Sequence, residues 1–292
     1  MLPGVVALER EGRGCLCHYR PEPTRVKRGL NVAKGLDGKV TVITGAGRGI
    51  GQAIAERYAA EGAAVLVADV DTEAAEAVAA GIAASGGSAR AQAADVRNPA
   101  DITAMFDAAE AALGPVDIVV NNAGIGGASS IAEQSMDAWD NMFAINVRGV
   151  FLGVQEAARR MEPRGSGIII NIASAAGKIA RPYMACYCAT KHAVIGITRS
   201  TAMELAPSGV RVVALCPGIV DTRLWREDLN PDLTELEGRE NESAWDVRVA
   251  GIPIGRHQVT EDVANAAYML ASDDASYITG ISLSVDGGMV LH

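Results

Sequence analysis

Tyr187 and Lys191 lie four residues apart in the stretch 171–191, and Ser174 precedes the tyrosine by thirteen residues. On a helix, side chains at positions i and i+4 share one face, so the ammonium group of Lys191 can approach the phenol of Tyr187. A cation at about 4 Å is worth roughly 4 kcal/mol at an effective dielectric constant near 20, or about 3 pKa units. This predicts a tyrosine pKa of about 7, which suits a general acid or base at neutral pH.

Ser174 directly follows the apolar run 167–173, which predicts a buried strand. In an open α/β sheet, ligands bind at the carboxyl ends of the strands, so the serine would lie beside a substrate. A Y-x-x-x-K spacing alone also occurs by chance on many helices, and a serine after a strand is commonly a cap or turn residue. The interpretation as a catalytic site therefore depends on the elements that come before these residues.

A glycine-rich turn stands near the start of the regular part of the chain. An apolar strand is predicted over 39–44, followed by GAGRGIG at 45–51 and an alanine-rich helix to about residue 61. This order directs backbone N–H groups and a helix N-terminus at a phosphate. The spacing of Gly45, Gly49 and Gly51 differs from the ordinary G-x-G-x-x-G fingerprint. The strand and helix around it nevertheless favour a dinucleotide-binding turn.

Asp69 ends the second predicted strand, over 64–69. A carboxylate there can accept hydrogen bonds from both ribose hydroxyls and would repel a 2′-phosphate, so it selects NAD over NADP. Its alternative use, as a helix N-cap, suits Asp71 or Thr72 better. Arg48 favours the opposite choice, because a basic side chain in the glycine loop could meet a 2′-phosphate. We give Asp69 more weight and predict NAD, with NADP less favoured.

Strands and helices alternate through the rest of the chain. The predicted strands are 89–94, 116–121, 167–173, 210–216 and 281–286, and the predicted helices are 99–113, 136–161 and 184–205. This alternation predicts an α/β fold: a single-domain Rossmann-type, doubly wound parallel sheet of about seven strands with helices on both faces, over residues 36–292. The segment 222–253 is acidic and reads as irregular, with Trp225 as an aromatic anchor. We expect it to be a substrate lid.

The composition describes a globular chain and excludes several classes of partner. With 292 residues, 49% of them hydrophobic and 21% charged, the chain is long enough for one large domain. A net charge of −9 argues against nucleic acid, because phosphate backbones require basic surfaces. Since no apolar run approaches the roughly 18–20 residues of a membrane span, no membrane contact is expected.

The cysteines and the N-terminal residues lead to three further expectations. Five cysteines, an odd number, do not form a disulfide framework and indicate a reducing compartment, so the predicted location is cytoplasmic. Cys15, Cys17 and His18 lack a second ligand pair for zinc, so no metal site is expected. Residues 1–35 carry seven Lys or Arg, three Glu and several prolines, which predicts a disordered N-terminal extension.

From about residue 38 onward, the chain resembles the short-chain dehydrogenase/reductase family. The stretches that carry the resemblance are TGAGRGIG at 44–51, NNAG at 121–124, INVRG around Asn146, NIAS ending at Ser174, Tyr187-x-x-x-Lys191 and PGIVDT at 217–222. The resemblance implies a catalytic tetrad of Asn146, Ser174, Tyr187 and Lys191. It implies a cofactor site that consists of Gly45, Arg48, Gly49, Ile50, Gly51, Asp69, Val70, Asp95, Val96, Asn122, Ala123, Gly124, Tyr187, Lys191, Pro217, Gly218, Ile219 and Thr222.

The resemblance also implies a role for each member of the tetrad. Ser174 would donate a hydrogen bond to the substrate oxygen, and Tyr187 would exchange a proton with it while a hydride moves between the nicotinamide and a secondary carbinol carbon. Lys191 would bind the nicotinamide ribose and lower the pKa of the tyrosine. Asn146, at a local distortion of its helix, would hold a water that links Lys191 to solvent.

A finer resemblance concerns the substrate. YCATKHAVIGIT, CPGIVDTRLW and the terminal VDGGMV are similar to the branch that includes bacterial sorbitol, galactitol and butanediol or acetoin dehydrogenases. This implies a small-molecule alcohol or ketone substrate, a small polyol or vicinal diol. The expected substrate pocket consists of Ser174, Ala176, Tyr183, Tyr187, Gly218 and Trp225.

Two other functions remain open at this point. An NADP-dependent 3-oxoacyl (carrier protein) reductase would need a basic docking surface and a basic residue near Asp69, whereas this sequence has an acid there and an acidic lid. A dinucleotide-binding sensor without turnover would have no need for Ser174, Tyr187 and Lys191 together. The family forms tetramers of 222 symmetry through its long helices and C-terminal segments, so the resemblance implies a homotetramer.

Overall fold

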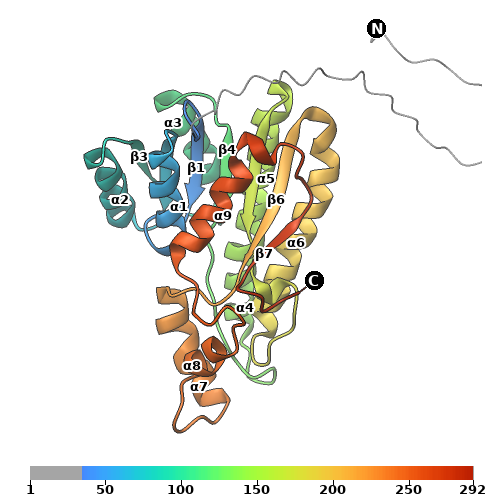
Figure 1. Cartoon of the computed structure of the whole chain (residues 1–292). Coiled ribbons are helices and arrows are strands. Elements are labelled where there is room, and N and C mark those ends of the chain that lie inside the picture. Colours follow the sequence, from blue (N-terminus) through green and yellow to red (C-terminus); the bar gives the residue numbers. More distant parts are fainter. Residues whose placement is uncertain (1–34, 292) are drawn as a thin grey trace, which may run out of the picture. The chain divides into compact units, whose positions relative to one another are not determined.

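The computed structural model describes residues 35–291, so the expectation of a disordered N-terminal extension falls almost entirely outside the described residues. A single parallel sheet lies at the centre, with the strand order β3-β2-β1-β4-β5-β6-β7 (Figure 1). The strands are β1 (Val40–Thr44), β2 (Ala64–Asp69), β3 (Ser88–Ala93), β4 (Ile118–Asn121), β5 (Gly167–Ile172), β6 (Val210–Pro217) and β7 (Ser282–Val285). The predicted doubly wound parallel sheet is therefore confirmed. The strand order reverses between β1 and β4, the place where such sheets bind ligands.

Helices cover both faces of the sheet. Side chains of α1 (Gly49–Ala60), α2 (Thr72–Ala84) and α9 (Thr260–Ala271) share one buried cluster on one face. Those of α3 (Pro99–Ala112), α5 (Val150–Met161) and α6 (Ala185–Leu205) share another on the opposite face. Successive side chains of a strand belong to the two clusters in turn: in β5, Ile168 and Ile170 lie in the first cluster and Ile169 lies in the second. Coverage on both faces explains why these strands read as continuous apolar runs.

The ends of the early elements follow local capping chemistry. The Asp71 carboxylate caps α2 by accepting a hydrogen bond from the backbone N–H of Ala74, at 3.1 Å. Asn98 caps α3 in the same way, and Pro99 occupies the first helical position, where no intrahelical N–H bond is lost. The N-cap prediction for Asp71 is confirmed, so Asp69 is not needed for that purpose.

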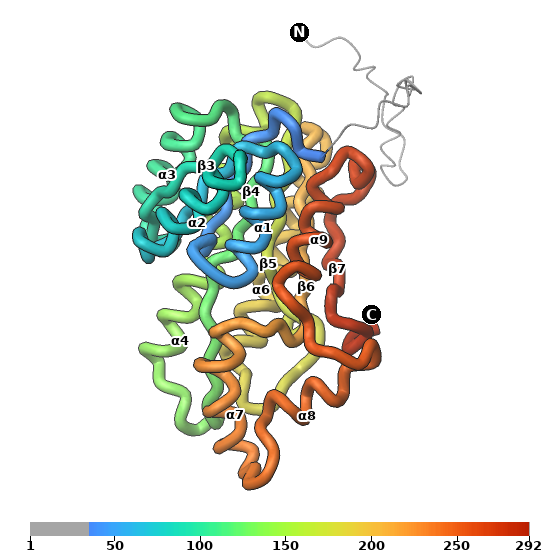
Figure 2. Tube along the Cα trace, turned by 60° about the vertical axis from the view of Figure 1, so that its left-hand side comes forward, coloured from blue at the N-terminus to red at the C-terminus, as the bar shows by residue number. Residues whose placement is uncertain are grey.

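The lid segment, residues 222–253, is more regular than the sequence suggested. It contains a π-helical turn (Leu224–Leu229), α7 (Asn230–Leu236) and α8 (Ala244–Ala250), and Figure 2 shows both α-helices at the same end of the molecule as α4 (Met136–Phe143). The prediction of irregular structure was wrong: Pro231 lies in the first turn of α7, where proline is tolerated, so it does not interrupt the helix.

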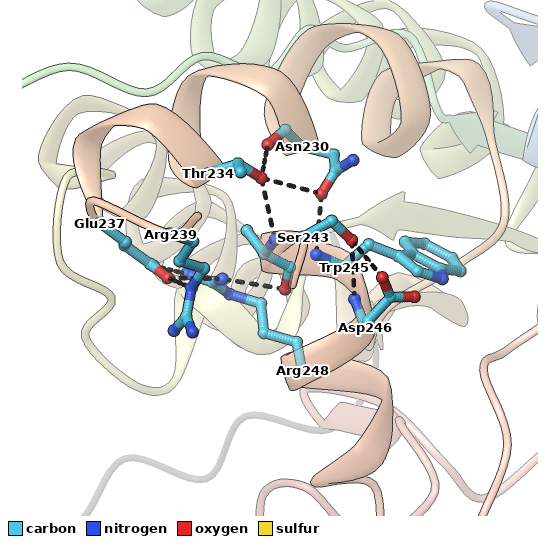
Figure 3. A network of polar contacts seen from close by, with 9 residues as sticks. Asn230, Thr234, Glu237, Arg239, Ser243, Trp245, Asp246 and Arg248 are labelled. Carbon is cyan, nitrogen blue, oxygen red and sulfur yellow. Dashed lines mark hydrogen bonds and ion pairs between the residues drawn. The ribbon is translucent and has the colours of Figure 1, made fainter. Parts of the chain in front are cut away.

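Polar bonds hold the lid segment together (Figure 3). The Asn230 carboxamide oxygen accepts a hydrogen bond from the backbone N–H of Trp245 at 2.8 Å, and the Thr234 hydroxyl accepts one from Ala244 at 2.9 Å. Ser243 caps α8 through the backbone N–H of Asp246 at 3.2 Å. These bonds join α7 to α8, and apolar packing supports them: Leu229 and Leu233, four residues apart, are buried in one cluster, with Trp225 packed against it. This helical spacing is a signal that sequence analysis could have used.

Candidate active site

A cavity of about 600 Å³ lies at the carboxyl ends of the strands. All the predicted cofactor, catalytic and substrate residues line it except Gly51, Asn146 and Tyr183. Its wall includes the glycine loop after β1, Asp69 at the end of β2, the residues after β4 and β5, and the first turns of α6. Residues more than 170 positions apart in the sequence therefore meet at one site.

The glycine loop has a shape that only small residues permit. Gly45 and Gly49 have φ values of 62° and 57°, in the left-handed region. A Cβ added at Gly51 would clash with the carbonyl oxygen of Gly45, so Gly51 supports the loop from behind and does not line the cavity. The Asn122 carboxamide donates hydrogen bonds of 2.9 Å to the carbonyl oxygens of Thr44 and Gly45, which fixes the loop to the end of β4.

The N-terminus of α1 follows this loop and has no side-chain cap. Arg48, at the N-cap position, makes no capping hydrogen bond, and no side chain among residues 35–291 caps the first backbone N–H groups of the helix. Such N–H groups and the helix dipole attract anions. Together with the glycine loop, they fit the pyrophosphate of a dinucleotide.

Asp69 lies almost fully buried at the cavity wall, with 8% of its surface exposed. Its carboxylate accepts hydrogen bonds from the backbone N–H groups of Gly47 at 2.9 Å and Asp71 at 3.0 Å. Each oxygen keeps a further acceptor site for a ribose hydroxyl. Arg48, the competing residue in cofactor choice, forms an exposed ion pair with Asp71 at 2.5 Å. The cation in the glycine loop thus already has a carboxylate partner.

Ser174 and the first turns of α6 form the next part of the wall. The Ser174 hydroxyl oxygen accepts a hydrogen bond from the backbone N–H of Ala176 at 3.1 Å. Tyr187 and Lys191 are both buried, and the lysine Nζ lies 5.7 Å from the centre of the tyrosine ring. Nζ also donates a hydrogen bond of 3.0 Å to the carbonyl oxygen of Ile172, at the end of β5. Ser174, Tyr187 and Lys191 thus line the same cavity.

The predicted pKa of about 7 for Tyr187 is wrong in this structure. Burial raises the pKa of Tyr187 to about 12, although the neighbouring Ser174 side chain lowers it in part. Burial also lowers the pKa of Lys191 to about 8. The dominant effect on the tyrosine is desolvation, which depends on burial and which sequence spacing does not show.

Asn146 lies behind the cavity, in a helix that is distorted as the resemblance implied. A π-helical stretch, Ala144–Gly149, separates α4 from α5 and contains Asn146, which is fully buried. The Asn146 carboxamide accepts a hydrogen bond from the backbone N–H of Ile125 and donates one to its carbonyl oxygen, both at 2.9 Å. It also donates to the Thr190 hydroxyl at 3.2 Å, next to Lys191. Its role in holding a water stays a prediction.

Tyr183 departs from the prediction that it lines the substrate pocket. Its backbone has a φ of 61°, in the left-handed region, and 38% of its surface is exposed. Its carbonyl oxygen accepts a hydrogen bond of 2.9 Å from the backbone N–H of Ser129. This turn takes the residue out of the cavity lining, and sequence spacing could not show it.

Several charged residues of the lining were not anticipated. Arg181, Arg223, Asp228 and Arg248 all face the cavity, the first in the turn before α6 and the others from the lid segment. Arg181 stands six residues before Tyr187, a signal that sequence analysis could have used. Arg248 lies in the segment 222–253, which was predicted to be irregular, so its position on a helix at the cavity was not anticipated.

Comparison with known proteins agrees with this geometry. A family model described as enoyl-(acyl carrier protein) reductase matches residues 45–290. The chain is 42% identical to 2-(S)-hydroxypropyl-CoM dehydrogenase 3 of Xanthobacter autotrophicus, over 87% of this chain and 97% of that protein. It is 39% identical to D-threitol dehydrogenase of Mycolicibacterium smegmatis, over 88% and 94% of the two chains.

A solved structure is similar over the same region. The crystal structure of 3-ketoacyl-(acyl-carrier-protein) reductase from Brucella melitensis complexed with NADH matches with a TM-score of 0.78 and 39% identity, over 87% of this chain and 98% of that one. The fold, the motif residues and the similar proteins all indicate the same family. The chain belongs to the short-chain dehydrogenase/reductase family and is a dehydrogenase that acts on CH–OH groups.

Proposed function

We propose that this protein transfers a hydride between NAD(H) and a secondary alcohol or ketone, with Tyr187 as the general acid and base. The observation that carries the proposal is the meeting of Ser174, Tyr187 and Lys191 in the same cavity as the glycine loop. The preferred substrate is a small polyol or vicinal diol, as the name of the D-threitol dehydrogenase relative suggests.

The cofactor would be held along the whole cavity. The glycine loop and the N-terminus of α1 would bind its pyrophosphate, Asp69 its adenosine ribose, and Ile219 with Thr222 its carboxamide. The carboxylate of Asp69, already oriented by two backbone N–H groups, supports NAD over NADP. When bound, the oxidised cofactor supplies a hydride-accepting carbon and a positive charge.

The hydrogen bonds of the side chains support their proposed roles. The Ser174 oxygen accepts from a backbone N–H, so its O–H proton can be donated to a substrate oxygen in place of the neighbouring Tyr187 phenol. Lys191 uses one N–H bond on the Ile172 carbonyl and keeps two for ribose hydroxyls. A positive charge beside the buried phenol would lower the pKa of Tyr187 from about 12 toward the working range.

The lid segment, the assembly and the location complete the proposal. Leu224 and Trp225 line the cavity from the lid segment, which supports closure over a substrate.

Phe151 on α5 and Met203 on α6 are 47% and 81% exposed, which supports burial of these helices in a homotetramer. The free cysteines among residues 35–291 support a reducing, cytoplasmic location. None of the described helices is long and apolar enough to span a membrane.

A second candidate function is reduction of a 3-oxoacyl thioester. It is favoured by the name of the Brucella melitensis relative. Asp69 disfavours its NADP-dependent form, because a carboxylate at that position repels a 2′-phosphate.

A panel assay tests the proposal. Sorbitol, threitol and 2,3-butanediol would be offered with NAD⁺ and with NADP⁺, and acetoin and a 3-oxoacyl thioester with the reduced cofactors. We expect oxidation of at least one diol or polyol with NAD⁺. Turnover of the thioester alone would contradict the polyol proposal, and absence of any turnover would contradict the enzyme mechanism itself.

A further inference from the structure

Two guanidinium groups, those of Arg181 and Arg248, enter the cavity beside the proposed catalytic residues. Arg181 lies in the turn before α6, and Arg248 lies on α8 of the lid segment. Met184 and Tyr187, close to Arg181 in the chain, line the same wall. Neither arginine has a task in hydride or proton transfer, and a neutral substrate would offer no anionic group to either.

Arg248 is fixed in position by the lid segment (Figure 3). Only 13% of its side chain is exposed, and it donates hydrogen bonds to both carboxylate oxygens of Glu237 and to the carbonyl oxygen of Ala244, the last at 3.1 Å. Glu237 also pairs with Arg239 at 2.5 Å. Burial raises the pKa of Glu237, but its bonds to the two arginines bring that pKa below the ordinary value. The single carboxylate of Glu237 is shared by the two arginines Arg239 and Arg248, so these three side chains together keep a net positive charge.

Arg181 has no such partner. It is half-buried, and within residues 35–291 no carboxylate lies within ion-pair distance of its guanidinium. Burial and the repulsion from Arg248 lower the pKa of Arg181. A partly desolvated cation beside another cation is unfavourable unless an anion approaches. The structure therefore keeps an unsatisfied positive charge at the wall of the cavity.

The other charges near the lid do not remove this excess. Arg223 lines the cavity but forms an ion pair with Glu227 at 2.6 Å. Asp228 is an acid in the lining; it is exposed and makes no ion pair with a described residue. The lining thus has one exposed acid, Asp228, against two half-buried arginines, Arg181 and Arg248, so the local balance stays positive.

We propose that Arg181 and Arg248 bind an anionic group on the substrate, a carboxylate, sulfonate or phosphate, several atoms from the carbinol carbon. The inference rests on the proposed function and narrows its substrate class to acidic alcohols. Planar guanidinium groups bind such anions through paired hydrogen bonds. Because Arg248 belongs to α8, the same anion would join the turn before α6 to the lid segment and favour its closure.

Matched substrates test this inference. The acid 3,4-dihydroxybutanoate and the neutral 1,2,4-butanetriol share a secondary carbinol, as do sorbitol 6-phosphate and sorbitol. For each pair, kcat/KM with NAD⁺ would be measured for the wild-type protein, Arg181→Gln and Arg181→Lys. We expect the wild type to prefer the anionic member. In Arg181→Gln, the ratio of acid to neutral kcat/KM should fall by about 10-fold to 100-fold, mainly through KM.

Two controls separate local binding from general charge. Arg181→Lys keeps the charge but loses the planar fork, so its ratio should lie between those of the wild type and Arg181→Gln. Arg159→Gln removes an exposed arginine on α5 that pairs with Glu156 outside the cavity lining, and it should leave the ratio unchanged. An equal fall in the ratio for Arg159→Gln would overturn the proposal.

The outcomes distinguish this inference from the proposed function. If the wild type oxidises neutral and acidic members equally well, the anion site is wrong while hydride transfer stands. If no alcohol is oxidised, the proposed function fails, and calorimetry with NADH present then compares 3,4-dihydroxybutanoate with the triol. Tighter binding of the acid that is lost in Arg181→Gln supports the anion site, and equal binding of the two overturns it.

Discussion

Tyr187 offers the most direct test at the scale of a single residue. Replacement by Phe removes only the hydroxyl, so the fold and NADH binding should persist while kcat falls by about 10²-fold to 10⁴-fold. The loss should appear in kcat and not only in KM, because the proton moves on the way to the transition state. Steady-state kinetics and NADH fluorescence would measure the two effects. A variant with normal kcat would remove Tyr187 from the mechanism.

The lowered pKa of Lys191 predicts that the free energy of unfolding depends on pH. Its pKa is about 8 in the folded protein against 10.5 for an ordinary lysine, so between these values the unfolded chain binds more protons and stability rises with pH. Lys191→Met should abolish this rise. The difference in unfolding free energy, wild type minus variant, should therefore increase by about 3 kcal/mol from pH 8 to pH 10.5. Urea denaturation at several pH values would measure it, and parallel curves for the two proteins would contradict it.

Asp69 should control cofactor choice. For the wild type, kcat/KM with NAD⁺ should exceed that with NADP⁺ at least about 10-fold, which corresponds to roughly 1.4 kcal/mol. Asp69→Asn keeps the shape but removes the negative charge, so this preference should shrink. Arg48→Gln serves as the control: since Arg48 is engaged by Asp71, its loss should leave kcat/KM with NADP⁺ unchanged, whereas a contact with the 2′-phosphate would make that value fall. Equal values of kcat/KM with NAD⁺ and NADP⁺ in the wild type would contradict the prediction.

At the scale of elements, the cap of α8 governs the order of the lid segment. Ser243→Ala removes a capping bond worth about 1 kcal/mol from a helix of seven residues, so amide exchange in α8 should become about fivefold faster. Ser135→Ala is the matched control, because Ser135 caps α4 through the same kind of bond at 3.2 Å. Hydrogen exchange resolved by segment would show the difference. An unchanged exchange rate in α8 would contradict the prediction and would mean that the hydrogen bonds of Asn230 keep α8 ordered without the Ser243 cap.

The elements also show what a sequence can and cannot predict. The strands were found to within two residues at each end because burial on both faces leaves apolar runs such as that of β5. The lid helices were missed because the many charged residues of this stretch hide a short apolar period, that of Leu229 and Leu233, which are buried in one cluster. Hydrogen bonds to Asn230 and Thr234, which leave no apolar period, also stabilise these helices. The Tyr187 pKa and the turn at Tyr183 depend on burial and backbone conformation, which are properties of the folded chain.

At the scale of the whole molecule, exposed apolar side chains lead to the last prediction. Phe151 on α5 is 47% exposed and Met203 on α6 is 81% exposed, positions that a stable assembly would cover. We expect a homotetramer at micromolar concentration in light scattering. Phe151→Glu would place a charge in the interface, so its mass should fall to that of a dimer or a monomer, while its circular dichroism stays that of the wild type.

A matched variant makes this prediction specific to the two helices. Ile131 is 80% exposed but lies outside α5 and α6, so Ile131→Glu adds the same charge without entering the proposed interface. It should leave the mass of the assembly unchanged. A wild-type protein that is monomeric at micromolar concentration would refute the assembly, and equal dissociation of both variants would show that added charge, not the faces of α5 and α6, controls it.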